Sequence, residues 1–167
     1  TPAPVAGPTI TVPAATTVGP ADVPTGFART AQGAVGQLAA IDTTVLSGMT
    51  IAHTEAVHAT WALPGAPPTQ QWVMTGNVQA FLAASGAPSL DATTAITATP
   101  VAGQVKGVDG DRWALACVLL DVRATITATA RIGYGHCERM QWAGDERDGR
   151  WMIAPGPQPA RAPSTWP

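Results

Sequence analysis

The sequence predicts an α+β domain in which N-terminal helices pack on one face of an antiparallel sheet. Two observations lead to this prediction. Apolar residues recur at helical spacing before residue 86, whereas residues 92–154 have the Thr/Val-rich and alternating patterns of β-strands. The chain has 167 residues, enough to build one core of ordinary size. We therefore expect a single domain over residues 27–156.

Three helices are expected in the first half of the chain. The first should begin after Thr30, whose hydroxyl can cap the free amides of a first turn, and should end or kink at Gly48. A second helix is expected over residues 50–63 and a third over residues 71–86, with the loop PGAPPTQ between them. The apolar stripe of the first helix consists of Ala34, Val35, Leu38, Ala39, Ile41, Val45, Leu46 and Met49.

Strands are expected at residues 92–105, 112–122, 123–132, 132–142 and 150–154. The segments KGVDGD (106–111) and AGDERDG (143–149) are typical of turns. Residues 112–122 are apolar on both faces, which is typical of a central strand. In residues 132–142 the even-numbered positions share one face. This face carries Tyr134, His136, Glu138 and Trp142, which could form a pocket or a partner surface.

Two cysteines, Cys117 and Cys137, are predicted to form a disulfide. If the chain folds back at residues 126–128, they lie opposite each other on neighbouring strands, with Cα atoms about 4.5–5.5 Å apart. Free buried thiols and a catalytic cysteine are the alternatives. His136 and Cys137 are adjacent on one strand and point to opposite faces, which argues against a cysteine–histidine nucleophile.

The face of the sheet on which the disulfide lies is a separate question. Strict alternation places Cys137 on the face of Arg131, Arg139 and Gln141. A β-bulge at Gly133 or Gly135 would move it to the other face. Both arrangements are compatible with the sequence.

No catalytic residue, metal site or cofactor is expected. The segment HTEAVH (53–58) differs from the metalloprotease motif, which needs histidines four residues apart. His53 and His58 are five residues apart, so their side chains diverge by roughly 140° on a helix. The chain carries a net charge of −2 and has no basic cluster, which argues against nucleic-acid binding.

Both ends of the chain are Pro-rich. Residues 1–26 are predicted to be a Pro/Thr/Ala-rich spacer, and residues 157–167 a C-terminal tail. Only 12% of the residues are charged, and two cysteines in such a chain are typical of an oxidising compartment. No run of 18 apolar residues is present, so a membrane anchor would have to precede Thr1.

Three stretches carry a family resemblance: VPTGFARTAQGAVGQLAAI (23–41), YGHCERMQW (134–142) and RWMIAPGPQPARAPSTWP (150–167). They resemble membrane-anchored conjugation proteins of actinobacterial mobile elements. In plan, such proteins are similar to the TcpC-like and VirB-type bitopic scaffolds of type IV secretion machines. The resemblance implies a nuclear-transport-factor-2-like (cystatin-like) cone fold, an upstream transmembrane helix, an extracytoplasmic location and no catalytic residues.

The favoured function is therefore a non-enzymatic assembly domain of a conjugation or secretion apparatus. Its expected partners are other subunits of that apparatus and copies of the chain itself. The alternative is a ligand-binding or enzymatic member of the cone fold that uses Tyr134, His136 and Glu138. A secreted structural domain is a third interpretation.

Overall fold

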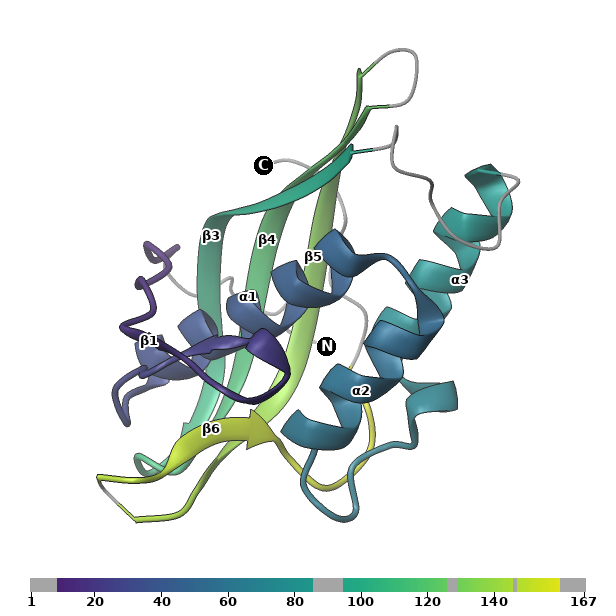
Figure 1. Cartoon of the computed structure of the whole chain (residues 1–167). Helices are drawn as coiled ribbons and strands as arrows, with labels where there is room; N and C mark the ends of the chain where they lie inside the picture. The colour runs from purple at the N-terminus through teal and green to yellow at the C-terminus, as the bar shows by residue number, and fades with distance from the viewer. Residues whose placement is uncertain (1–8, 86–94, 126–128, 146, 160–167) are drawn as a thin grey trace, which may run out of the picture.

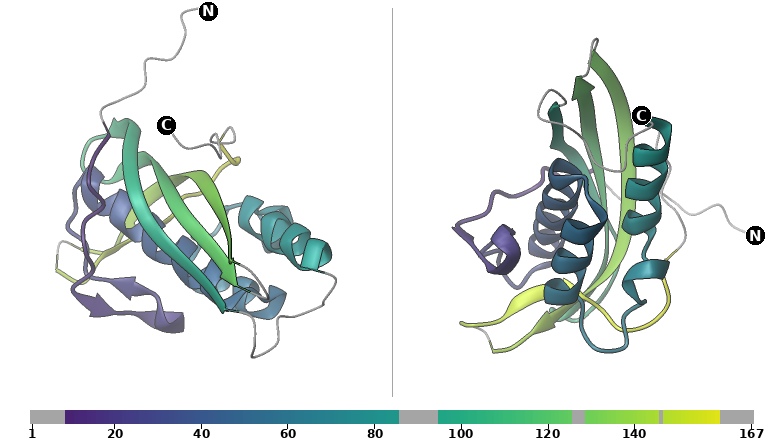
Figure 2. Two further views of the ribbon diagram at one scale, coloured as in Figure 1. Left: turned by 90° about the horizontal axis from the view of Figure 1, so that it is seen from above. Right: turned by 45° about the vertical axis from the view of Figure 1, so that its right-hand side comes forward.

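The computed structural model describes residues 9–85, 95–125, 129–145 and 147–159. These residues form an α+β fold with three α-helices and a four-stranded antiparallel sheet, which confirms the predicted class. The sheet has four strands in place of the five expected, and the small two-stranded sheet was not predicted. The helices lie on one face of the large sheet, whose long strands bend along their length (Figure 1). Two further views show this layered arrangement from other sides (Figure 2).

Threonines cap the first two helices, and the cap predicted at Thr30 is confirmed. Helix α1 spans Ala31–Gly48, and the Thr30 hydroxyl accepts a hydrogen bond from the Gly33 amide at 3.0 Å. Helix α2 spans Ile51–Trp61 and is capped by Thr50 in the same way. Helix α3 spans Val73–Ser85 and is preceded by the 3₁₀ turn η2, Thr69–Gln71. Gly86, the expected end of α3, lies outside the described residues.

The large sheet has the strand order β3-β4-β5-β6. Strand β3 spans Ala95–Asp109, β4 Trp113–Thr125, β5 Thr129–Ala143 and β6 Arg150–Ile153. Strand β4 lies between two neighbours, which fits a segment that is apolar on both faces. All neighbouring strands in this sheet are antiparallel, as expected.

Two strand boundaries differ from the prediction. The turn expected at residues 106–111 is shorter, because β3 continues to Asp109. The extra residues of β3 are accommodated by shifts in its register with β4, one of which lies between Val105 and Gly107. Residues 123–132 are not one strand, since β4 ends at Thr125 and β5 begins opposite it at Thr129. The predicted reversal at residues 126–128 lies outside the described residues.

The core lies between α1 and the sheet. All the residues of the predicted apolar stripe of α1 are buried, and α1 packs mainly against β3 and β4. Glycines allow this close approach. A Cβ at Gly103 of β3 would lie 2.4 Å from Cγ1 of Val35, and one at Gly36 would lie 2.6 Å from the Phe27 ring.

The predicted Pro-rich spacer is described from residue 9, and this part contacts the domain. Ile10 exchanges two backbone hydrogen bonds with Gly103 of β3, at 2.8 and 3.0 Å. Further along, β1 (Thr17–Val18) pairs with β2 (Pro24–Thr25), and Val23 is fully buried in the core. Among the described residues no helix is long and apolar enough to cross a membrane.

Candidate functional site: a buried ionic cluster beneath α1

Cys117 and Cys137 lie directly opposite each other on β4 and β5 and form a disulfide, with Cα atoms 4.0 Å apart. The pairing confirms the predicted partners. The ladder between β4 and β5 has no register shift, so the bulge considered at Gly133 or Gly135 is absent. Strict alternation therefore holds, and the disulfide lies on the sheet face that α1 does not cover.

His136 and Glu138 point to the opposite face, beneath the helices. Both are almost fully buried, at 2% and 1% exposure. The side chain of His136 meets Asp42 of α1, whose carboxylate oxygen Oδ2 lies 2.7 Å from Nδ1. On its other side, Nε2 lies 3.4 Å from Oε2 of Glu138, within ion-pair distance but not aligned as a hydrogen bond. We call Asp42, His136 and Glu138 the buried trio.

Hydrogen-bond donors surround Glu138. The indole Nε1 of Trp72, just before α3, donates to Oε2 at 3.1 Å. Gln158 of the C-terminal segment donates to Oε1 at 3.5 Å, and the Arg139 backbone amide donates to the same oxygen at 3.3 Å. The Gln158 side chain also accepts from the Val73 amide at the start of α3. Glu138 therefore connects β5, α3 and the C-terminal segment.

The electrostatics of the trio follow from burial and from the close charges. Burial alone would lower the pKa of His136, but the charge and hydrogen bond of Asp42, with the charge of Glu138, raise it to about 10. For Asp42, burial raises the pKa, while the neighbouring imidazolium works in the opposite direction. At neutral pH, the trio thus holds a protonated imidazole between two acidic side chains.

Tyr134 lies on the same face of β5, two residues before His136. Its hydroxyl contacts Asn77 of α3 through a short hydrogen bond and Sδ of Met74 at 3.0 Å. Trp142 lies six residues along the strand from His136, about 20 Å away at the usual rise. Its indole packs against Trp151 at 5.7 Å and donates to the Asp145 carbonyl. The structure therefore brings Tyr134, His136 and Glu138 together with α3, and places Trp142 elsewhere.

Sequence reasoning missed three members of this site: Asp42, Trp72 and Gln158. One signal could have identified Asp42. It lies four residues after Leu38 and three before Val45, so it interrupts the apolar stripe of α1 with a carboxylate. A charged residue at such a position needs a buried partner. Trp72 and Gln158 carried no comparable signal.

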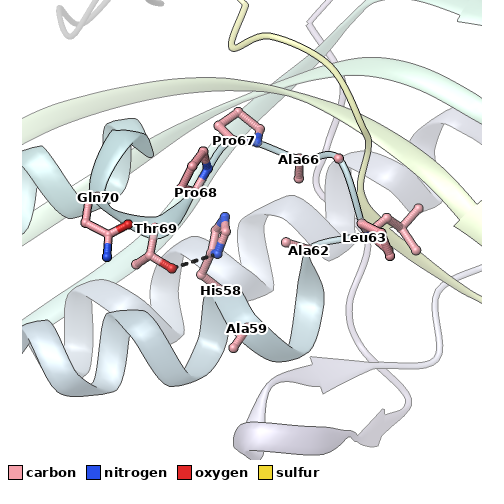
Figure 3. Close-up of a pocket in the computed structure, with 11 residues that line it drawn as sticks. His58, Ala59, Ala62, Leu63, Ala66, Pro67, Pro68, Thr69 and Gln70 are labelled. Atoms are coloured by element: carbon pink, nitrogen blue, oxygen red, sulfur yellow. Dashed lines mark hydrogen bonds between the residues drawn. The ribbon is translucent and has the colours of Figure 1, made fainter.

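An open pocket of about 470 Å³ lies beside the buried trio, between α2 and the loop of residues 62–70 (Figure 3). His58 forms part of its wall, and its Nδ1 lies 3.0 Å from the Thr69 hydroxyl. The ring of His58 also packs on Trp72, with centroids 5.0 Å apart. Trp72 thus separates the pocket from Glu138. Tyr134, His136 and Glu138 do not line this pocket.

Among the described residues no group of three His, Cys, Asp or Glu side chains has the geometry of a metal site. In comparisons with known proteins, no family model, no curated protein and no solved structure matched the chain.

Proposed function

We propose that this chain is a non-enzymatic, extracytoplasmic assembly domain of a conjugative transfer or secretion apparatus, with a fold of the nuclear-transport-factor-2-like cone type. The main support for this proposal is that the buried trio is shielded from solvent. Trp72 is 1% exposed and hydrogen-bonds to Glu138, while His136 and Glu138 are closed off from solvent. A catalytic acid or base has to reach its substrate, so this arrangement favours a structural role for the trio.

The disulfide supports the extracytoplasmic location. Disulfides persist in oxidising compartments and are rare in the cytosol of most organisms. The Cys117–Cys137 bridge ties the neighbouring strands β4 and β5 to each other near their middle. The proposed partners are other subunits of the apparatus and further copies of the chain.

Deleting the gene in a strain that carries it tests the proposal. We expect the frequency of conjugative transfer to fall and to recover when the wild-type gene is supplied in trans. As a comparison, the deletion strain also receives a gene that encodes the double variant His136→Ala, Asp42→Ala. The cellular level of this variant protein is measured alongside transfer. Transfer that is unaffected by the deletion would contradict the proposed apparatus.

Protease added to the outside of intact protoplasts tests the location separately. An extracytoplasmic domain is digested, whereas a cytoplasmic control protein in the same cells survives. A domain that stays protected until the protoplasts are lysed would rule out the proposed location.

The alternative, a ligand-binding or enzymatic cone domain, has one observation in its favour, the close contact of Asp42 with His136. Such a pair can hold or move a proton when a substrate reaches it. The matched experiment is a ligand screen by thermal shift on wild type and His136→Ala. A ligand that stabilises the wild type alone would favour this alternative over the assembly domain.

A further inference from the structure

After β6 the chain continues as a short segment, residues 154–159, which we call the C-terminal strap. Its sequence is APGPQP, so every second residue is a proline that has no backbone N–H. The first two amides that remain are both used. Ala154 donates to the Arg139 carbonyl at 2.8 Å, and Gly156 donates to the Gly65 carbonyl at 3.1 Å. The strap therefore joins β5 to the loop of residues 62–70, and it runs toward the start of α3 (Figure 2).

The side chain of Gln158 attaches the far end of the strap at two points. Its carbonyl oxygen accepts a hydrogen bond from the Val73 amide at 3.2 Å, and its amide nitrogen donates to Oε1 of Glu138 at 3.5 Å. Val73 is the first residue of α3, and the amides of a first helical turn have no acceptor within their own helix. Gln158 thus caps α3 from another part of the chain and ties this cap to the buried trio.

The attachment matters because α3 has little other contact with the sheet. It packs mainly against η2, α2 and α1, whereas α1 packs on the sheet directly. At its start, α3 is linked to β5 through the Trp72 indole and through Gln158, and both bonds end on the carboxylate of Glu138. Trp72 and the strap therefore hold this end of α3 over the trio together.

Hydrogen bonds, and not burial, hold the strap in place. Residues 155–157 are exposed, and residues 158 and 159 are half-buried. Each hydrogen bond contributes little net free energy, because water competes for the same groups. Segments with few buried contacts open at a lower free energy than the core of a domain. The strap is therefore expected to detach while the core remains intact.

We propose that the C-terminal strap is a releasable fastening for α3. When Gln158 detaches, the start of α3 and Trp72 move away from Glu138, while the sheet stays folded. This opening brings solvent to the Glu138 carboxylate, whose Oε2 lies 3.4 Å from Nε2 of His136. The strap thus controls access to the buried trio. The inference goes beyond the proposed assembly function and does not depend on it.

Hydrogen exchange of the whole chain, followed by NMR over a series of low urea concentrations, tests the proposal. Two probes report the opening: the indole N–H of Trp72, and the Gly76 amide, which donates to the Trp72 carbonyl at 3.3 Å. Val118 and Leu120, buried at the centre of β4, report unfolding of the sheet. In the wild type we expect the two probes to exchange faster than the β4 amides and to depend less on urea, because a local opening exposes less surface.

The variant Gln158→Met keeps a side chain of similar length but removes both hydrogen bonds of the strap. Neither probe loses its own acceptor in this variant, so faster exchange reports opening of α3. We expect the Trp72 indole and the Gly76 amide to exchange about tenfold faster, the effect of one to two net hydrogen bonds. The matched control is Gln141→Met, on the opposite face of β5 from Glu138, and it should leave both probes unchanged.

Two results would overturn the inference. One is exchange of the Trp72 indole and the Gly76 amide with the same free energy and urea dependence as the β4 amides, which would mean that α3 opens only when the whole domain unfolds. The other is an unchanged rate at both probes in Gln158→Met. If this variant fails to fold, the wild-type comparison decides alone. The measurement is separate from the transfer assay, so either can fail without affecting the other.

Discussion

On each side of the sheet a carboxylate is paired with a cationic side chain, but the two pairs lie in opposite surroundings. On the helix-covered face, Asp42 meets His136 in the core, with side-chain exposures of 0% and 2%. On the other face, Asp121 meets Arg123 and Arg131, both at 3.1 Å, and these arginines are 53% and 55% exposed. The residues are chemically similar, but water reaches only the outer cluster.

This difference in solvent access reverses the pKa shifts of the two carboxyl groups. For Asp42, burial dominates and raises the pKa. For Asp121, partial burial acts in the same direction, but hydrogen bonds and charges of Arg123 and Arg131 outweigh it and lower the pKa. A buried cluster is therefore sensitive to the loss of any member, whereas an exposed cluster is screened by water and salt.

The largest expected effect is the loss of the buried cation. His136→Ala leaves Asp42 and Glu138 in the core without their positive partner. We expect the free energy of unfolding to fall by about 3–5 kcal/mol, the usual cost of breaking a buried pair. Urea denaturation followed by circular dichroism measures it. A loss similar to that of Arg131→Ala on the outer face would refute the distinction between the faces.

The disulfide on the outer face is expected to have the next largest effect. Its ring closes over a sequence separation of 20 residues, for which the loop-closure estimate is about 3 kcal/mol. Reduction should lower the urea midpoint of the wild type by a corresponding amount. The double variant Cys117→Ala, Cys137→Ala serves as control, since reductant should not affect it. Two reactive thiols in the denatured, unreduced wild type would show that the bridge does not form.

The buried trio should also make stability depend on pH. The pKa of His136 is raised from 6.5 to about 10 in the folded protein, so its stabilisation is complete below pH 6.5 and is lost as the pH rises through 10. The raised pKa of Asp42 acts with the same sign. Between pH 7 and 9 we expect the wild type to lose up to about 1.4 kcal/mol per pH unit.

His136→Gln removes the titrating group and provides the comparison for this pH dependence. Urea unfolding of both proteins at pH 7, 8 and 9 measures the two slopes. Parallel slopes would mean that His136 does not hold an extra proton in the folded state.

The smallest effect is expected from the outer ionic cluster. Asp121→Asn removes the charge that pairs with Arg123 and Arg131 and should lower the free energy of unfolding only slightly, because exposed ion pairs contribute little. The difference from wild type should shrink further in 1 M salt. Thermal unfolding at low and high salt tests both statements, and a salt-independent loss as large as that of His136→Ala would contradict them.

Local patterns in the sequence predicted most of the fold. Thr30 and Thr50 mark the starts of α1 and α2 because capping depends on residues within one turn. Alternation in β5 assigned His136 and Cys137 to opposite faces, and the structure confirms it. The strand boundaries were less accurate. The sequence between β4 and β5 contains no Gly, Pro or Asn, and β3 accommodates its extra residues in bulges that alternation does not predict.

The sequence by itself predicted the cap of the first helix, the α+β class and the cysteine pair, because each depends on residues close in the chain or on the regular pairing of two neighbouring strands. The structure decided that no bulge moves Cys137 to the other face of β5. Only the tertiary structure decided that Asp42 meets His136, 94 residues away. It also placed Trp72 over Glu138 and closed the trio from solvent. Such contacts depend on how α1 and α3 are positioned against the sheet. That position follows from packing of the whole core, which no local pattern encodes.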